Sequence, residues 1–353
     1  MADSSVLFQN RRVEKFWVDV LNEREEYIEP LDGVVSGSVA CSVDARIKRG
    51  GSLEIVSKKP INWWGRKRLR IWIEVNGYRW SLGVFIPSSP EQKHNGDKTS
   101  FTVEISDKLL ILDDDKIPYA LTIPKGTNLT SWVENYIRST GETKIYIAPS
   151  QLVNKRPLVW DAATEMLTVI NDILDYIGYF SLSVSPEGTF SAEPYMLPAD
   201  RPVMWDFREG VNSVQALEYT FSQDLTGIPN RIVYTTDPQD QDKKPLVSSW
   251  ENHDPDSPFS YEARGRWITE VKTDAEAADQ AELDKMVKRR ANRSLRPMAK
   301  IDLKSAALPV ALNQVVRYTD KHYRMMMTIR KFEVSLKPGE LMSITLRKAN
   351  REY

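Results

Sequence analysis

Histidine is the side chain that most often carries proton transfer or binds a metal near neutral pH, and this chain has three of them. His94, His253 and His322 lie in polar surroundings, and none has another histidine near it in the sequence. A metal site normally gathers several such ligands. We therefore interpret all three as surface histidines.

Two short acidic segments resemble places where a cation binds. One is Asp113, Asp114 and Asp115, and the other is the His-Asp-Pro-Asp sequence at 253–256. A calcium loop needs ligands at alternating positions, a glycine and a later glutamate, whereas consecutive aspartates point in different directions. We interpret the first segment as a solvated turn, with a hard-cation site as the alternative, and the second as a polar loop.

Recognisable catalytic motifs are lacking. Gly50-Gly51 has neither the lysine nor the spacing of a phosphate-binding loop, no dinucleotide fingerprint opens a helix, and no serine lies in a Gly-x-Ser-x-Gly sequence. The sequence does not exclude a pair of carboxylates for glycoside cleavage, because the chain has 49 acidic residues and only their separation in space would identify a pair. The sequence assigns no catalytic, cofactor-binding or metal-binding residue, and we expect no cofactor.

Basic residues form two clusters. The first is Arg66-Lys67-Arg68 with Arg70, beside Trp63-Trp64; the second is Lys288-Arg289-Arg290 with Arg293 and Arg296. Tryptophan next to arginine is compatible with base stacking along single-stranded nucleic acid. However, the first cluster precedes a half-buried strand and the second lies on a polar helix face. We favour a solvated surface or a subunit contact for both, with nucleic acid as the alternative.

Aromatic residues are abundant, with ten tryptophans and fourteen tyrosines. Tryptophan, tyrosine and arginine dominate the energetics of protein interfaces. We select Trp63, Trp64 and Trp250, which occur in turn or loop contexts, as candidate interface anchors. Packing of these indoles within the chain is the equal alternative.

Composition limits the class of protein. The 48 basic residues nearly cancel the 49 acidic ones, which argues against a protein that gains its affinity by neutralising phosphates. The single cysteine, Cys41, allows neither an intrachain disulfide nor a thiolate metal site, and we interpret it as an apolar residue on a strand. Neither a secretory signal nor a membrane-spanning stretch is recognisable, so we expect synthesis in a cytoplasm and treat the sequons at 128–130 and 292–294 as chance matches.

The first third of the chain reads as an all-β unit. Alternating runs separated by turn residues predict strands at 13–21, 34–43, 52–56, 69–75, 78–86 and 100–105. Asn76-Gly77, between the fourth and fifth runs, is a strong hairpin signal because both residues tolerate positive φ. Six strands in so short a segment predict a small barrel or sandwich.

The middle of the chain has a mixed pattern. Thr127 is placed to cap a helix that carries Leu129, Val133 and Ile137 and ends at Gly141. A strand follows at 144–148. An apolar stripe then predicts a helix from Asp161 to a terminating glycine at 178, followed by strands at 179–184 and 189–194 around a Pro-Glu-Gly turn.

The last third returns to strands. Predicted runs are 213–221, 231–234, 267–271, 300–304, 314–318, 325–335 and 341–347. A polar loop at 237–262 and a helix at 274–294, opened by a capping box from Thr273 to Glu276, interrupt them. The predicted fold class is a mixed, β-rich α+β protein. Two similar small β-barrels, at 1–117 and 201–353, flank an α+β domain at 118–200, and the second barrel contains the inserted helix.

This order resembles that of the hub proteins at the tips of tailed-phage tails, as in actinobacteriophage-like minor tail proteins, contractile-phage baseplates and the N-terminal part of siphophage tail-associated proteins. The segments that carry the resemblance are 83–107, 160–182, 190–194, the Pro-Asn-Arg-Ile-Val sequence at 229–233, and 336–347. The resemblance implies a homotrimer whose two barrels match the six-fold tail tube. It also implies a gate for DNA exit and a place in the virion tail tip.

The partners that the resemblance implies are the distal ring of the tail tube, the C-terminus of the tape-measure protein, and tip fibre, spike or receptor-binding proteins. Phage DNA is contacted only in transit and the host envelope only indirectly. The family has no catalytic motif in its hub portion, so we expect a structural protein rather than an enzyme. The alternatives are a tail-associated cell-wall hydrolase and a host-glycan-binding module.

Overall fold

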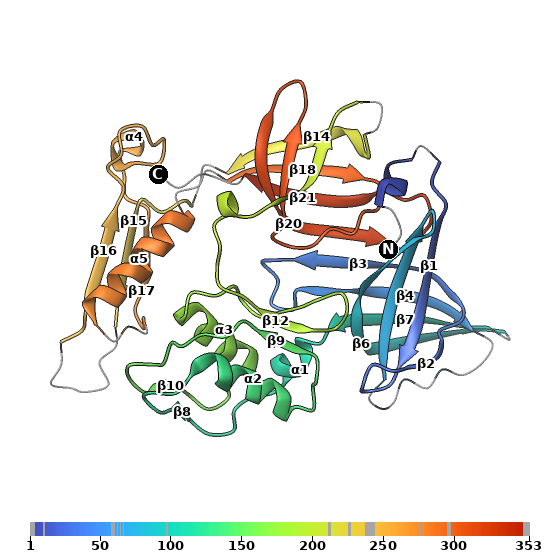
Figure 1. The fold of residues 1–353 in the computed structure, drawn as a ribbon, viewed down its shortest axis with the longest axis horizontal. Coiled ribbons are helices and arrows are strands. Elements are labelled where there is room, and N and C mark those ends of the chain that lie inside the picture. Colours follow the sequence, from blue (N-terminus) through green and yellow to red (C-terminus); the bar gives the residue numbers. More distant parts are fainter. Residues whose placement is uncertain are drawn as a thin grey trace.

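The computed structural model of this chain is rich in β-strands (Figure 1). It describes residues 4–9, 11–57, 61, 63, 65, 67–96, 98–210, 213–224, 227–236, 244–275, 277, 279–294 and 298–348. None of the helices in these ranges has the length and apolar character needed to cross a membrane.

One large sheet contains thirteen strands and takes them from both outer thirds of the chain. Its N-terminal strands are β1 (Glu14–Leu21), β2 (Tyr27–Pro30), β3 (Val34–Ser42), β4 (Arg49–Ser57), β5 (Arg68–Val75), β6 (Tyr78–Asn95) and β7 (Lys98–Asp107). Its C-terminal strands are β13 (Val203–Arg208), β14 (Gln215–Asp224), β18 (Met298–Ser305), β19 (Val315–Thr319), β20 (Arg324–Ser335) and β21 (Met342–Lys348). A short 3₁₀ turn, η1 (Ser4–Phe8), precedes them.

The two outer thirds meet along the pair β3–β20. These strands run antiparallel, with Cys41 opposite Phe332 and Val39 opposite Val334. The strand order runs β14-β18-β21-β20-β3-β4-β7-β6-β5-β1-β2, with β13 and β19 branching from β20. The described strands therefore form one continuous sheet and no closed barrel, so the predicted detail of two separate barrels is not confirmed. The physical reason is that the edge backbone groups of β3 and β20 pair with each other. Neither strand is therefore left to close a barrel within its own third of the chain.

A shared hydrophobic core lies under this sheet. It includes Val39, Ile71 and Val103 from the first third, and Ile301 and Phe332 from the last. Alternation along β5 brings this about, because Leu69, Ile71, Ile73 and Val75 are buried while Arg70, Trp72 and Glu74 face outward. The β-rich character of both outer thirds is confirmed.

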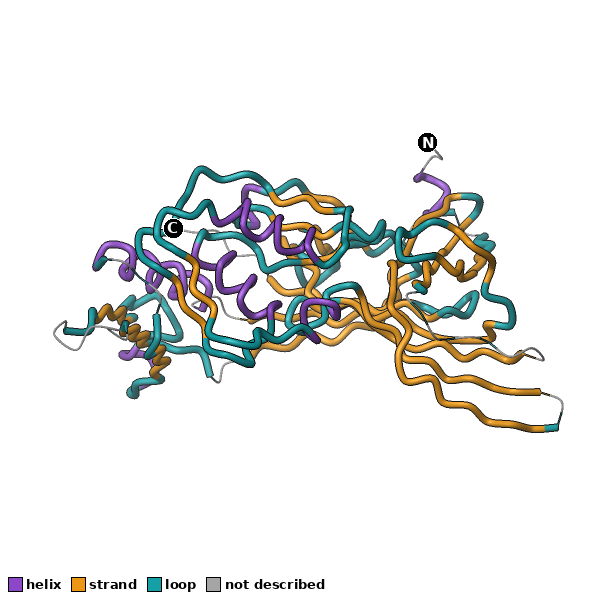
Figure 2. The backbone as a smooth tube through the Cα atoms, turned by 90° about the horizontal axis from the view of Figure 1, so that it is seen from below, coloured by secondary structure: helices purple, strands orange, loops and turns teal. Residues whose placement is uncertain are grey.

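The hairpin β5–β6 is confirmed around Asn76-Gly77, where φ is 49° and 84°. The strand after it is longer than predicted, because β6 continues to Asn95 and pairs with β7 as far as Lys98. The ends of these strands extend past the rest of the sheet at the right of Figure 1, and Figure 2 shows long paired strands projecting at that end.

The middle of the chain folds into a compact α+β module below the sheet in Figure 1. Its elements are α1 (Leu110–Asp114), β8 (Leu121–Ile123), α2 (Leu129–Ser139), β9 (Ile145–Ile147), β10 (Leu158–Trp160), α3 (Met166–Tyr176), β11 (Ser183–Val184), β12 (Phe190–Ala192) and η2 (Pro198–Asp200). A second core, with Val133, Ile137, Ile170, Ile173 and Phe190, holds it together.

Both predicted helix starts in this module are wrong. The cap of α2 is Asn128, whose side chain accepts a hydrogen bond from the backbone of Ser131, while the hydroxyl of Thr127 donates to Pro124. Helix α3 begins at Met166 rather than at Asp161. The preceding residues hydrogen-bond with 115–117 instead, and Ala163 takes a φ of 67°.

A separate lateral unit at the left of Figure 1 contains β15 (Arg231–Thr235), β16 (Val247–Glu251), α4 (Tyr261–Arg264), β17 (Thr269–Lys272) and α5 (Gln280–Ser294). Strand β15 pairs with β16 and β17, and Ile232 packs with Leu283 and Val287 of α5 in a third core.

This unit corrects two predictions about the last third. The predicted loop 237–262 contains strand β16, whose serines and charged residues hid its alternation. Helix α5 starts at Gln280 rather than at 274, because the backbone of Ala275 still hydrogen-bonds to Thr235 of β15. Asp279 caps the helix by accepting from the backbone of Glu282. Glu276 of the predicted capping box lies outside the described residues.

Candidate functional site: an ion cluster and an exposed aromatic face

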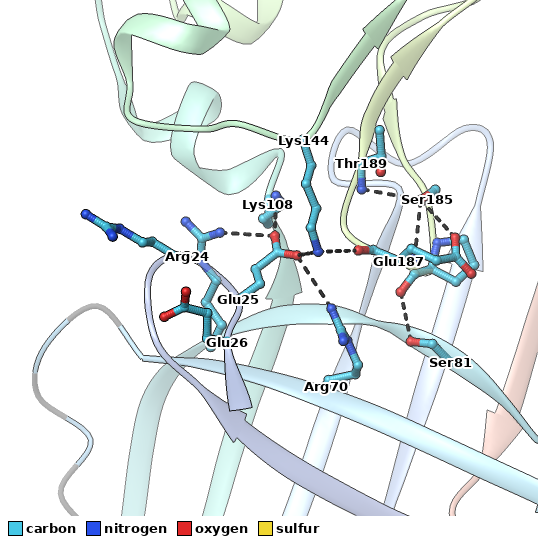
Figure 3. Close-up of polar contacts among 12 residues, drawn as sticks. Arg24, Glu25, Glu26, Arg70, Ser81, Lys108, Lys144, Ser185, Glu187 and Thr189 are labelled. Atoms are coloured by element: carbon cyan, nitrogen blue, oxygen red, sulfur yellow. Dashed lines mark hydrogen bonds and ion pairs between the residues drawn. The ribbon is translucent and has the colours of Figure 1, made fainter. Parts of the chain in front are cut away.

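A buried carboxylate, Glu25, lies where the large sheet meets the α+β module. It belongs to the turn between β1 and β2 and has a φ of 62°. Asn22 holds this turn, because its side-chain oxygen accepts from the backbones of Arg24 and Glu26, each at 2.9 Å. Figure 3 shows Glu25 pointing inward while Arg24 and Glu26 point away from it. The backbone of this turn thus adopts an unfavourable conformation that places one carboxylate in the interior.

Glu25 is shared by cations from both units. Lys108, at the end of β7, lies 2.5 Å from its Oε1, and Lys144, in the module, lies 2.6 Å from its Oε2. Arg68 and Arg70 of β5 approach the same carboxylate at 3.2 and 3.5 Å. The contacts tie the β1–β2 turn, the sheet and the module together.

Glu142 of the module completes the cluster. It accepts from Lys108 at 2.7 Å and forms an ion pair with Arg68. The side chain of Lys108 is fully buried and its ammonium also lies 4.9 Å from the ring of Phe190. We name these six residues the ion cluster: Glu25, Arg68, Arg70, Lys108, Glu142 and Lys144. Four cations face two carboxylates, so positive charge is in excess.

The cluster sets the charge state of Glu25. Burial alone raises the pKa of a carboxyl group, but hydrogen bonds and attraction from Lys108 and Lys144 outweigh it and hold the pKa of Glu25 below its ordinary value. A carboxyl group with a lowered folded-state pKa stabilises the fold at pH values above its unfolded pKa. That stabilisation is lost as the pH falls through the folded value.

The module also contacts the sheet through the turn between β11 and β12. Ser81 of β6 donates to the carbonyl of Pro186 at 2.8 Å. Within the module, Lys144 donates to the carbonyl of Glu187 in the same turn at 3.3 Å. A side chain at Gly188, where φ is 87°, would collide with the carboxylate of Glu25. The glycine is therefore required by close packing against the cluster.

A cleft of about 650 Å³ lies where the module, the sheet and the lateral unit meet. Its lining includes Tyr179 from the module, Glu270 and Arg290 from the lateral unit, and Asp44 and Arg330 from the sheet. Arg290 binds Glu270 through two bonds of 2.6 and 2.7 Å, and Arg330 pairs with Asp44. The walls that the lateral unit and the sheet contribute are thus each held by an ion pair.

Solved structures with a similar fold include phage tail proteins and a component of a secretion system. A tail protein from Neisseria meningitidis MC58 gives a TM-score of 0.70 over 95% of this chain and 97% of its own, at 10% identity. The 43 kDa tail protein of prophage MuSo2 from Shewanella oneidensis gives 0.65 over 94% and 98%, at 11% identity. An E. coli component of the type VI secretion system, described as similar to the T4 tail proteins gp27 and gp5, gives 0.52 over 97% and 77%, at 8% identity.

The chain has a phage tail-protein fold. Protein-family models and curated protein sequences give no match to it. Similarity at this level of sequence identity is similarity of fold alone, and it assigns no role to any individual residue.

The predicted surface histidines are confirmed as exposed. His94 hydrogen-bonds with Thr99. His253 lies between Glu262 at 2.7 Å and Glu251 at 3.3 Å, and their hydrogen bonds raise its pKa. In the described part of the chain, no three His, Cys, Asp or Glu side chains are grouped so as to hold a metal ion.

The acidic residues 113–115 end helix α1 and point to different partners. Asp113 pairs with Arg46, and Asp115 accepts from the hydroxyl of Tyr136. Cys41 is confirmed as a core residue on β3, where burial raises the pKa of its thiol to about 11. Gly50-Gly51 lies in β4 in the middle of the sheet.

The interpretation of the first basic cluster is wrong for Arg68, which is buried in the ion cluster rather than exposed to solvent, a subunit or nucleic acid. The buried carboxylates Glu25 and Glu142 provide the reason, since they stand far from it in sequence. Arg66 lies outside the described residues. In the second cluster Arg290 is paired with Glu270, and Arg296 lies outside the described residues.

The candidate anchors Trp63 and Trp250 pack within the chain. Trp63 lies edge-on to Phe101, with ring centroids 6.0 Å apart, and Trp250 packs on the core of the lateral unit. Trp64 lies outside the described residues. Sequence reasoning missed the tryptophans that do face outward, Trp17 and Trp72. Alternation along β5 marks Trp72 as outward-facing, and their contact becomes visible only once β1 and β5 are paired.

Proposed function

We propose that this chain is a structural component of a bacteriophage virion: a trimeric hub in the tail tip, or baseplate. In this role it adapts the six-fold tail tube to three-fold tip proteins and forms the gate through which DNA leaves. The observation that carries the proposal is the tail-protein fold, which solved tail proteins share over 94–95% of this chain.

The shape of the molecule supports an assembly role. Both outer thirds contribute antiparallel strands to one sheet, and we propose that they act as two related units at 1–117 and 201–353, around the module at 118–200. Three copies would then present six similar surfaces to a six-fold ring. The proposed partners are the distal ring of the tail tube, the C-terminus of the tape-measure protein, and fibre, spike or receptor-binding proteins.

The charge of the chain fits a channel that DNA only passes through. A formal net charge of −1 gives little general attraction for phosphates, so DNA would not be held during exit. We propose a non-catalytic protein, assembled in the cytoplasm of a bacterial host, that meets the host envelope only through its partners.

Electron cryomicroscopy of phage particles whose copy of this chain carries a small fused label tests the proposal. We expect the label at the tail tip with three copies per particle. Mass photometry of the purified chain, alone and with its ring partner, should show a trimer in at least one case. A label on the capsid or its absence from mature particles would refute the assignment, and so would a monomer in both photometry samples.

A further inference from the structure

Two tryptophans lie side by side on the outer surface of the N-terminal part of the sheet. Trp17 of β1 is directly opposite Trp72 of β5, and their rings stack with centroids 6.1 Å apart and planes 18° apart. The neighbouring Val18, Ile71 and Ile73 point the other way, into the core. Trp17 and Trp72 are half-buried and take no part in that core. Their rings therefore contact each other rather than the core, and part of their apolar surface stays open to solvent.

Two arginines border these rings. The guanidinium of Arg79 lies 5.0 Å from the ring of Trp72 and 5.9 Å from that of Trp17, and that of Arg70 lies 5.7 Å from Trp72. Arg79 is exposed and forms no ion pair with any described residue, and Arg70 is half-buried. We name Trp17, Arg70, Trp72 and Arg79 the tryptophan–arginine face.

Carboxylates close to this face are already engaged. Asp19 accepts from the indole of Trp72 at 2.8 Å, and Glu74 pairs with Lys15 at 3.5 Å. Arg70 also belongs to the ion cluster, where positive charge is in excess and its own contact with Glu25 is long at 3.5 Å. An additional carboxylate from outside would therefore be bound favourably here.

The same chain presents a surface of opposite character. Around β2, at one edge of the sheet, Tyr27 and Ile28 are 61% and 46% exposed. Two exposed carboxylates, Glu29 and Asp32, lie beside them, together with Glu26, which also accepts a hydrogen bond from Asn22. We name this segment, residues 23–32, the acidic edge. It offers the apolar side chains and the carboxylates that the tryptophan–arginine face lacks.

We propose that the tryptophan–arginine face of one copy binds the acidic edge of a second copy, and that this contact builds the oligomer. The inference deepens the proposed function and rests on it. The indoles cover Tyr27 and Ile28, while Arg79 and Arg70 receive carboxylates, a combination typical of interface hot spots. A protein occupant is favoured over nucleic acid, because the adjacent acidic edge repels phosphates.

Charge exchange tests the contact with the full-length chain. Analytical ultracentrifugation measures self-association of the wild type, Arg79→Glu, Glu29→Arg and the double variant that carries both changes. We expect each single variant to associate about tenfold more weakly or worse, because it places like charges together. The double variant should recover most of the association, since opposite charges face each other again. Lys93→Glu, on an exposed part of β6, is the control and should associate like the wild type.

Several outcomes would overturn the inference. The inference fails if the wild type is monomeric at every concentration. It also fails if either single variant associates like the wild type. A double variant that circular dichroism shows to be folded, but that does not recover association, contradicts it as well. If Arg79→Glu leaves association unchanged but weakens binding of a fluorescent single-stranded oligonucleotide, the face belongs to nucleic acid. A label still found at the tail tip in such cases would keep the proposed function and reject only this contact.

Discussion

At the scale of single residues, Glu25 is a buried carboxylate that joins the large sheet to the α+β module. It is buried, lies in a turn of positive φ and is shared by Lys108, Lys144 and Arg68. A buried carboxylate in such a position costs desolvation that only its cations offset. Removing its charge would leave four cations facing Glu142 alone.

Glu25→Gln should therefore destabilise the fold by about 3–5 kcal/mol, the usual cost of breaking a buried ion pair. The measurement is the free energy of unfolding from urea titration. Glu26→Gln is the matched control, because the adjacent carboxylate is exposed and accepts a hydrogen bond from Asn22; we expect a change within about 0.5 kcal/mol. If the two substitutions lowered the free energy of unfolding equally, the ion cluster would not be what makes Glu25 important for stability.

Asp107 gives a pH dependence of the opposite sign. Burial raises its pKa to about 6, against partial compensation by the backbone of Leu109 and the charge of Arg49. Between the unfolded value and about 6, the folded state keeps a proton that the unfolded chain loses, so stability falls as the pH rises. Asp107→Asn removes this penalty. Its stability relative to wild type should increase by about 2 kcal/mol between pH 4.5 and 7.5, measured by urea unfolding. A constant difference would disprove the burial argument.

At the scale of elements, glycine decides where strands can approach. Gly51 of β4 lies so close to β3 that a Cβ would collide with the carbonyl of Ser38. Its role is close packing between the paired backbones of β3 and β4. Gly77, in the turn between β5 and β6, has open space around it.

Gly51→Ala should accordingly lower the free energy of unfolding by about 3 kcal/mol or more, because backbone atoms must shift. Gly77→Ala, with φ at 84° but no collision, should cost only about 1 kcal/mol. Thermal denaturation followed by circular dichroism measures both. The reverse order of effects would show that conformational strain, rather than contact between β3 and β4, dominates.

At the scale of the whole molecule, the pair β3–β20 makes the outer thirds one structure. Phe332 is 4% exposed and lies in the shared core opposite Cys41. Phe332→Ala should cost about 3–5 kcal/mol. It should also reduce hydrogen-exchange protection on both sides of the pair, in β4 as well as in β21, because cooperative units lose protection together.

Ile170→Ala, in the core of the α+β module, is the comparison and should act mainly within 109–192. Loss of protection confined to residues beyond 200 in Phe332→Ala would show that the outer thirds open independently. That result would favour the predicted division at 117 and 200 over a single cooperative sheet.

The sequence by itself determined what depends on neighbours along the chain. Alternation placed most strands of the outer thirds but missed β2, β13 and β16. Asn76-Gly77 placed a hairpin, apolar spacing placed α2 and α3, and a capping box placed α5, though none of the three helix starts was right. The starts at Asp161 and Thr273 failed because contacts with distant segments competed for the same backbone groups. The start at Thr127 failed because its hydroxyl bonds to Pro124, while the next residue, Asn128, caps the helix.

Only the tertiary structure decided the rest. The ion cluster joins residues 25, 68, 108 and 142, and the tryptophan–arginine face joins 17 and 72, with no spacing in the sequence to connect them. The same holds for the sheet, since the pairing of β3 with β20 spans almost the whole chain. Local patterns specify which face of a strand is apolar, but edge pairing and ion pairing are settled by which distant segments meet.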